Sequence, residues 1–285
     1  MSDNIDFNDL RKRAVSQPLV VDKYTADPSA HVFDGKIYIY PSHDIDAGIP
    51  FNDNGDHFGM RDYHAYTMES PDDKLATDLG KILDIDEVPW AKRQMWAPDI
   101  ARKGEKYYFY FPAKDKNDIF KIGVAIGDSP SGPFTPDPKP IEGSYSIDPA
   151  VFNDKGKYYM YFGGLWGGQL QKYRNNIYSN GNELRSDDDF AFGPLVAELS
   201  DDMRGFSTSP EEIIIQDENG NPLLAGDNSR RYFEGPWVHK YNEKYYLSYS
   251  TGDTHFICYA IGYTPKGPFK LSLIHISEPT RHTRI

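Results

Sequence analysis

A short pattern that occurs four times limits the possible folds of this chain more than any other feature. In each copy a lysine stands eight residues after a proline, and a tyrosine stands two residues after that lysine. The segments read ADPSAHVFDGKIYIY, APDIARKGEKYYFYF, DPAVFNDKGKYYMYF and GPWVHKYNEKYYLSY, and their prolines are Pro28, Pro98, Pro149 and Pro236. Each has turn residues between two strand-like runs, which is typical of a β-hairpin. The sequence therefore predicts a repeat protein made of similar hairpins.

The spacing of the copies indicates the architecture. The prolines follow one another at intervals of roughly 50 to 90 residues, and repeats of about 40 to 50 residues with several strands each are typical of β-propeller blades. The longer intervals leave room for loop insertions, and the loop over residues 45–62 has a length that usually signals function. We therefore expect an all-β fold, a propeller in which equivalent residues of every blade meet at one end of the central channel.

Acidic residues occupy the positions before the prolines in three of the four copies. Asp27 and Asp148 stand directly before their prolines, Glu234 stands two residues before its own, and the second copy has Ala97. An aspartate before a proline is usually only a turn residue. The shared position in the repeat favours another interpretation, in which three carboxylates converge on one site.

Composition and charge exclude several classes of function. The 285 residues carry a formal net charge of −12, which argues against a nucleic-acid or anionic membrane partner. No apolar run is long enough for a transmembrane helix. The single cysteine, Cys258, rules out an internal disulfide framework and is expected in the core. The first residues lack the apolar region of a signal peptide, so a cytoplasmic location is expected.

The repeats divide the chain into three parts. We expect a polar arm over residues 1–17 and the propeller over residues 18–270. The last part, residues 271–285, reads LSLIHISEPTRHTRI from Leu271 onward. It resembles translated read-through of a sequencing-library adaptor and is expected not to be native.

The repeats also resemble a known family. The segments YTADPSAHVFDGKIYIYPSHD, MWAPDIARKGEKYYFYF, SIDPAVFNDKGKYYMYFGGLWGGQLQ and FEGPWVHKYNEKYYLSYSTGD are similar to glycoside hydrolase family 43, the five-bladed β-propeller β-xylosidases and α-L-arabinofuranosidases. The likeness runs from about Leu19 to Lys270. Only about four blades have a counterpart here, which implies truncation before the fifth blade. Two uncovered blade faces would then make the chain poorly soluble and weakly active or inactive.

The resemblance assigns a role to each carboxylate. It implies an inverting mechanism in which Asp27 is the general base, Glu234 the general acid, and Asp148 the group that raises the pKa of the acid and orients it. The physics agrees, because an acid that works near neutral pH needs a pKa raised by burial or by a like charge. The resemblance implies no cofactor for the chemistry. It does imply a structural calcium ion on the propeller axis of the full-length protein, held partly by a fifth-blade histidine.

Other side chains are candidates for substrate contact. Trp96 and Trp166 can stack on sugar faces, with core packing as the alternative. Arg230 precedes the acid closely enough to reach the channel, with a surface salt bridge as the alternative. Asp99 is two positions off the register of Asp27 and is expected to be a structural hydrogen-bonding residue. The segment HFGMRDYH lacks zinc-motif spacing, so no metal ligands are predicted.

These features together predict an inverting exo-glycosidase that acts on an oligosaccharide. Its expected substrates are terminal β-D-xylosyl, and also α-L-arabinofuranosyl, residues of short xylo-oligosaccharides or arabinoxylan fragments. Long insertions at 44–64 and 165–232 favour a closed pocket and thus exo action. The alternatives are an endo-arabinanase or xylanase on the same scaffold and a propeller that only binds carbohydrate. The sequence does not rank xylose against arabinose and leaves the oligomeric state open.

Overall fold

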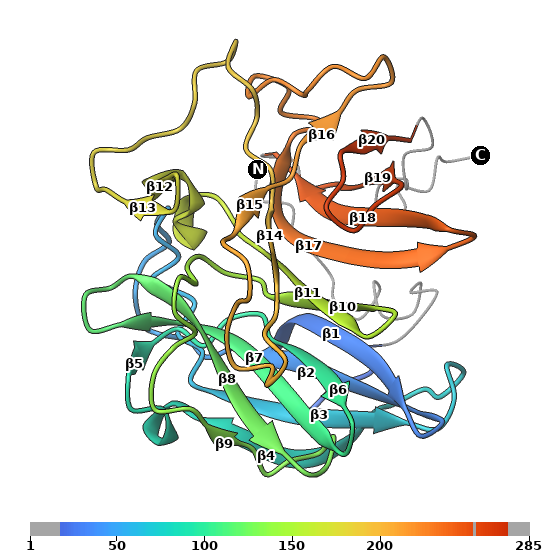
Figure 1. The fold of residues 1–285 in the computed structure, drawn as a ribbon. Helices are drawn as coiled ribbons and strands as arrows, with labels where there is room; N and C mark the ends of the chain where they lie inside the picture. The colour runs from blue at the N-terminus through green and yellow to red at the C-terminus, as the bar shows by residue number, and fades with distance from the viewer. Residues whose placement is uncertain (1–17, 253–254, 273–285) are drawn as a thin grey trace, which may run out of the picture.

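The computed structural model describes residues 18–252 and 255–272, and it folds all four repeats into antiparallel hairpins (Figure 1). Each hairpin closes on the lysine of its repeat, in the pairs Phe33–Lys36, Lys103–Lys106, Asp154–Lys157 and Tyr241–Lys244. Three of the two-residue turns have positive φ at both positions, as in Asp34 (49°) and Gly35 (83°). This geometry matches the twist of the flanking strands and favours tight hairpins.

The hairpins extend into four separate sheets. The first contains β1 (Thr25–Phe33), β2 (Lys36–His43), β3 (Asp62–Met68) and β4 (Thr77–Asp84). The second contains β6 (Asp99–Lys103), β7 (Lys106–Asp115), β8 (Phe120–Gly127) and β9 (Thr135–Pro136), with β5 (Ala91–Arg93) also paired to β7. The third contains β10 (Ala150–Asp154), β11 (Lys157–Phe162), β14 (Leu195–Glu198) and β15 (Glu211–Glu212).

The fourth sheet gains a strand from an earlier part of the chain. It contains β17 (Tyr232–Tyr241), β18 (Lys244–Thr251), β19 (Ile257–Gly262) and β20 (Phe269–Leu271), and β16 (Ile215–Gln216) pairs in parallel with β20. Within residues 18–252 and 255–272 the sheets form a β-propeller arrangement of four blades, which confirms the expected all-β class.

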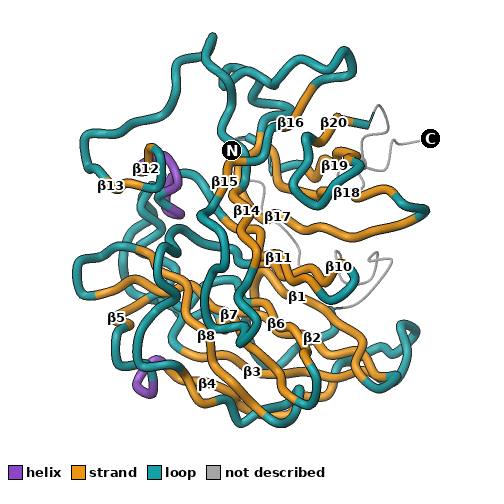
Figure 2. Tube along the Cα trace, viewed as in Figure 1, coloured by secondary structure: helices purple, strands orange, loops and turns teal. Residues whose placement is uncertain are grey.

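The connections between the sheets hold little regular structure (Figure 2). They contain the small hairpin of β12 (Tyr173–Arg174) and β13 (Ile177–Tyr178) and three single-turn 3₁₀ helices, η1 (Ile85–Glu87), η2 (Trp166–Gly168) and η3 (Leu170–Lys172). No helix among the described residues is long and apolar enough to cross a membrane.

A tyrosine four residues after the repeat lysine links each of the first three blades to the next. The Tyr40 hydroxyl donates to the Pro130 carbonyl at 2.7 Å, Tyr110 to Met203 at 2.9 Å, and Tyr161 to Pro265 at 2.7 Å. All three side chains are fully buried, so each hydroxyl needs such a partner. Pro130 and Pro265 belong to the similar segments SPSGPF and TPKGPF, whose equivalence the sequence already indicates.

Two details differ from the sequence interpretation. The sequence of residues 72–88 predicts a polar connector, yet 77–84 form the outer strand β4. Pairing with β3 supplies the backbone hydrogen bonds of this strand, although its local sequence does not predict a strand. The propeller also continues to Leu271 in β20, one residue past its expected end. The expected arm over residues 1–17 lies outside the described residues, and so do residues 273–285 of the expected non-native tail.

The innermost strands position the site. β6 contacts both β1 and β10, and β10 contacts β17, so the first hairpin strands of the four blades lie side by side around the centre (Figure 1). Residues at the start of these strands, including the segments before the four prolines, are therefore brought to the same end of the molecule.

Candidate active site

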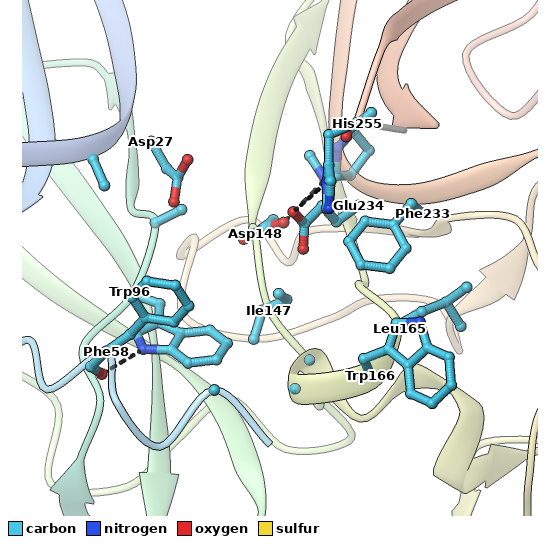
Figure 3. A pocket seen from close by; sticks show the side chains of 18 of the residues that line it. Asp27, Phe58, Trp96, Ile147, Asp148, Leu165, Trp166, Phe233, Glu234 and His255 are labelled. Carbon is cyan, nitrogen blue, oxygen red and sulfur yellow. Dashed lines mark hydrogen bonds and ion pairs between the residues drawn. The ribbon is translucent and has the colours of Figure 1, made fainter. Parts of the chain in front are cut away.

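A cavity of about 1230 Å³ lies at that end of the inner strands. The equivalent position of every repeat contributes to its wall, through Asp27, Ala97, Asp148 and Gly235. Glu234 lines it as well, and the three carboxyl groups face the same space from three blades (Figure 3). The structure thus brings together the three acids that the repeat register singles out.

The backbone at these positions is unusual, and it aims the side chains. Asp27, Asp148 and Gly235 have φ of 45°, 57° and 65°, although a residue before proline is normally extended. The pairing register of β1 shifts at Asp27, and that of β17 shifts next to Gly235, as at β-bulges that redirect a side chain. In the fourth blade glycine takes the left-handed position, so the longer Glu234 side chain supplies the carboxylate from one residue earlier. Such local strain is typical of functional sites.

Asp148 connects the third and fourth blades. Its Oδ2 accepts a hydrogen bond of 2.9 Å from the backbone N–H of Gly235, next to Glu234. Burial raises the pKa of Asp148 well above its ordinary value, and the charges of Glu234 and Asp27 raise it further, while the Gly235 hydrogen bond opposes them. Asp148 is therefore disposed to hold a proton and fixes the backbone beside Glu234.

Glu234 and Asp27 differ in their surroundings. Burial raises the pKa of Glu234 to about 7, with a further contribution from the Asp27 charge. The Glu234 side chain still keeps 34% of its surface exposed and reaches the cavity. Burial and the charge of Asp44 also raise the pKa of Asp27. Paired carboxyl groups of which one holds its proton near neutral pH are suited to general acid and general base roles.

Aromatic side chains form much of the remaining wall. Trp96 lines the cavity and is held in place because its Nε1 donates to the Phe58 carbonyl at 3.1 Å. Trp166 lines it from η2 with 39% of its surface exposed, and Phe51 and Phe58 come from the long first-blade loop. Flat apolar rings beside carboxyl groups suit the faces of a sugar ring.

Comparison with known families identifies the protein class. The family model described as glycosyl hydrolases family 43 matches residues 17–272. The chain belongs to glycoside hydrolase family 43. It is thus a glycoside hydrolase, as the carboxylates and the propeller indicate.

Several relatives of this family 43 enzyme are similar over most of their length. A xylosidase/arabinosidase of Bacteroides ovatus is 57% identical, with 88% of this chain and 78% of the relative covered. Xylosidase/arabinosidase 43A of Humicola insolens is 58% identical, with coverage of 88% and 80%. A solved β-xylosidase/α-arabinofuranosidase from a compost microbial metagenome, in complex with xylotriose and calcium-free, is 61% identical with a TM-score of 0.88, covering 91% and 80%.

One predicted substrate contact does not fit the structure of this family 43 enzyme. Arg230 is not among the residues that line the cavity in the described chain. Its guanidinium lies 2.6 Å from Asp227 and 3.1 Å from Glu218, so the alternative of a surface salt bridge is the arrangement observed. Arg230 sits in the turn before β17, where the nearby acids hold it away from the channel.

Sequence reasoning did not identify His255 and Trp237, which also line the cavity. His255 places its Nδ1 3.9 Å from Glu234 Oε1, and its ring packs edge-on against Phe233 (Figure 3). Trp237 is half-buried and lines the cavity, with its ring 5.4 Å from the His31 ring. Neither occupies an acidic position of the repeat, so only the tertiary arrangement shows their location.

The resemblance implies a calcium ion on the propeller axis of the full-length protein, held partly by a fifth-blade histidine. Calcium requires six to eight oxygen ligands. The buried central carboxylate, Asp99, is already committed, since its Oδ1 lies 2.6 Å from His31 Nε2 and its Oδ2 accepts from the Val151 N–H at 2.6 Å. These contacts confirm Asp99 as a structural hydrogen-bonding residue.

Proposed function

We propose that this enzyme is an inverting exo-glycosidase that releases terminal β-D-xylosyl and α-L-arabinofuranosyl residues from short xylo-oligosaccharides or arabinoxylan fragments. One observation carries the proposal, namely three carboxyl groups from three blades in one cavity, with the pKa of Glu234 raised to about 7. Similar proteins named xylosidase/arabinosidase support the choice of sugars.

Each carboxyl group has a separate role in the proposed reaction. Protonated Glu234 donates its proton to the glycosidic oxygen as the bond to the anomeric carbon breaks. Asp27 accepts a proton from the water that attacks this carbon from the opposite face, so the configuration inverts. The raised pKa of Glu234 has burial and Asp27 as its causes, and the contact of Asp148 is with the backbone beside the acid. The role of Asp148 is therefore mainly to orient Glu234.

The wall of the cavity favours exo action over the alternatives. Phe51 and Phe58 from one loop and Trp166 from another line the same cavity as the carboxyl groups, as expected for a pocket that takes the end of a chain. An endo-acting enzyme needs a cleft open at both ends. A propeller that only binds carbohydrate needs no acid with a raised pKa, so the carboxyl groups argue against that alternative.

The decisive experiment follows the hydrolysis of an aryl β-xyloside by proton NMR, because the only xylose that this substrate releases is the sugar whose glycosidic bond is cleaved. Inversion requires α-xylose as the first product, with the β anomer appearing only through mutarotation. First appearance of β-xylose would contradict the inverting mechanism. Asp27→Asn is the matched control and should bind xylobiose with little turnover. Binding without hydrolysis by the unsubstituted enzyme would favour the binding module. Xylobiose, xylotriose and xylotetraose as the first products from xylohexaose, in place of xylose and xylopentaose, would favour endo action.

A further inference from the structure

Three potential metal ligands lie on one face of the first blade. In the β2–β3 register Ser42 pairs with Tyr63, which places His43 opposite Asp62 on the neighbouring strand. Asp62 and His64 are alternate residues of β3, so they project from the same side of the sheet. Nitrogen or carboxylate oxygen atoms of His43, Asp62 and His64 all lie within 4.8 Å of one another.

A fourth residue fixes the orientation of His64. The His64 Nδ1 atom lies 3.0 Å from both carboxylate oxygens of Asp78, which also accepts from Lys23 at 2.7 Å. Because the Asp78 carboxylate accepts hydrogen bonds, the His64 Nδ1 atom beside its two oxygens must carry a proton. In a neutral His64 ring the Nε2 atom is therefore a lone-pair acceptor, and it faces Asp62 Oδ2 at 3.8 Å. A cation between these two acceptors would be held by both of them.

The second histidine completes the group. His43 Nδ1 lies 2.7 Å from Asp62 Oδ1, and the two imidazole rings are 5.8 Å apart and inclined by 74°. His43, Asp62 and His64 keep 26%, 15% and 14% of their side-chain surface exposed, so an ion can enter from solvent without unfolding the blade.

We propose that His43, Asp62 and His64 form a binding site for a divalent transition-metal ion of the zinc type. Two imidazoles and one carboxylate suit zinc, cobalt or nickel, whereas calcium and magnesium prefer oxygen ligands alone. Zinc bonds to nitrogen and oxygen are about 2.0–2.2 Å long, so tetrahedral ligand atoms are roughly 3.3–3.6 Å apart. The ligand atoms need only small side-chain movements to reach that spacing, and water completes the fourth position. Asp78 then holds the second nitrogen of a ligating histidine, as carboxylates do in many zinc sites.

The proposed site is distinct from the carboxylate cavity. None of its three ligands is among the residues that line the cavity in the described chain. Its position joins β2, β3 and β4, and His43 pairs with Thr25 near the start of β1. A bound ion therefore tethers the strands of the first blade and stabilises the blade that carries Asp27. This inference does not depend on the proposed reaction.

The test uses the full chain after treatment with a chelator. Cobalt(II) is titrated while its visible absorption is recorded, and zinc(II) is then used to displace it. We expect one saturable tetrahedral site per chain and a rise in melting temperature with zinc but not with calcium. His43→Gln and Asp62→Asn should each weaken binding at least 10-fold, and Asp78→Asn should weaken it about 10- to 100-fold. The control His239→Gln removes an exposed histidine of β17 and should change nothing.

Two results would overturn the proposal. One is the absence of a saturable site in the unsubstituted chain. The other is an affinity that stays the same in His43→Gln and Asp62→Asn. Zinc X-ray absorption spectroscopy on the unsubstituted chain is independent of whether any variant folds. It should show two imidazole ligands with the remaining ligands oxygen, and a first shell with sulfur or with one imidazole would contradict the assignment.

Discussion

Asp99 and Asp148 are both aspartates near the start of an inner strand, but their surroundings are opposite. Asp99 is fully buried, and each of its oxygens faces a hydrogen-bond donor, His31 or the Val151 amide. Asp148 receives one backbone hydrogen bond and faces the charges of Glu234 and Asp27. Donors make a buried carboxylate part of the scaffold, whereas neighbouring acids make it part of a proton-handling group.

Their partners respond accordingly. Burial alone would lower the pKa of His31, but the charge and hydrogen bond of Asp99 outweigh it and raise that pKa. In the cavity burial and like charge act in the same direction on Glu234. A shift of two positions in the repeat therefore separates a structural ion pair from the reactive carboxyl groups.

The largest effect should come from the acid on the cavity side of this comparison. Glu234→Gln keeps the shape but removes the proton donor, so kcat/KM for xylobiose should fall about 10²- to 10⁴-fold. The loss should be much smaller for an aryl xyloside whose leaving group needs no proton. Steady-state kinetics on both substrates measure this difference. Equal losses on the two substrates would remove Glu234 from the role of acid.

On the scaffold side of the comparison, Asp99→Ala should lower the free energy of unfolding and have little effect on the rate of hydrolysis. It leaves His31 buried without its charge partner, which typically costs about 3–5 kcal/mol. Urea unfolding measures the free energy of unfolding, and kinetics normalised to the folded fraction should change only a few-fold. The control Asp118→Ala removes a half-exposed partner of Arg93 and should cost about 1 kcal/mol or less. Unchanged stability in Asp99→Ala would mean that the two aspartates do not differ as described.

The pH dependence of stability should sharpen the comparison further. The folded state holds the Glu234 proton more tightly than the unfolded state, because its pKa is about 7 instead of the ordinary 4.5. This contribution to stability is present at low pH and is lost as the pH rises through about 7. Glu234→Gln has no proton to lose at this position. Its melting temperature, relative to that of the unsubstituted enzyme, should therefore rise between pH 5 and pH 8.

The expected gain is about 2–4 °C, which corresponds to about 1 kcal/mol in a protein of this size. A larger value is not expected, because a third of the Glu234 side chain is exposed and solvent weakens the effect. Differential scanning calorimetry measures it, and Glu243→Gln, a change at an exposed hairpin turn, is the matched control. A melting-temperature difference that stays constant or shrinks with rising pH would show that the Glu234 proton does not contribute to stability as described.

The smallest effect should separate sugar contact from proton transfer. Trp166→Ala removes an exposed ring of the cavity wall, and KM for xylobiose should rise about 2- to 10-fold with kcat nearly constant. The pH profile should stay unchanged, since the carboxyl groups are untouched. A shifted alkaline limb near pH 7 would mean that Trp166 also contributes to the burial of Glu234.

The repeat explains why the sequence predicts so much of this site. Local spacing does not reveal that Asp27, Asp148 and Glu234 meet in space. Equivalent positions in a propeller meet by symmetry, so aligning the four copies supplies the missing long-range information. The same alignment separates Asp99 from the site, and both results rest on hairpin turns that fix the register.

Features outside the repeat could not be predicted in this way. His43 and His64 are brought together by strand pairing across a long loop, and no local motif records that pairing. The outer strand β4 carries Gly80 and several charged residues, so only its pairing with β3 shows that it is a strand. Arg230 is close to Glu234 in sequence, but its acidic neighbours decide where it points.

The second blade gives the repeat a consequence for how such an enzyme can diversify. Its position in the register of the acids is Ala97, which presents only a methyl group to the cavity. Three blades contribute a carboxyl group to the site, and the second blade contributes a side chain that cannot exchange a proton. A larger or polar residue at position 97 can alter which sugar fits while every reactive group stays in place. The symmetry of the blades thus places the catalytic carboxyl groups and a position that can determine substrate specificity in different blades.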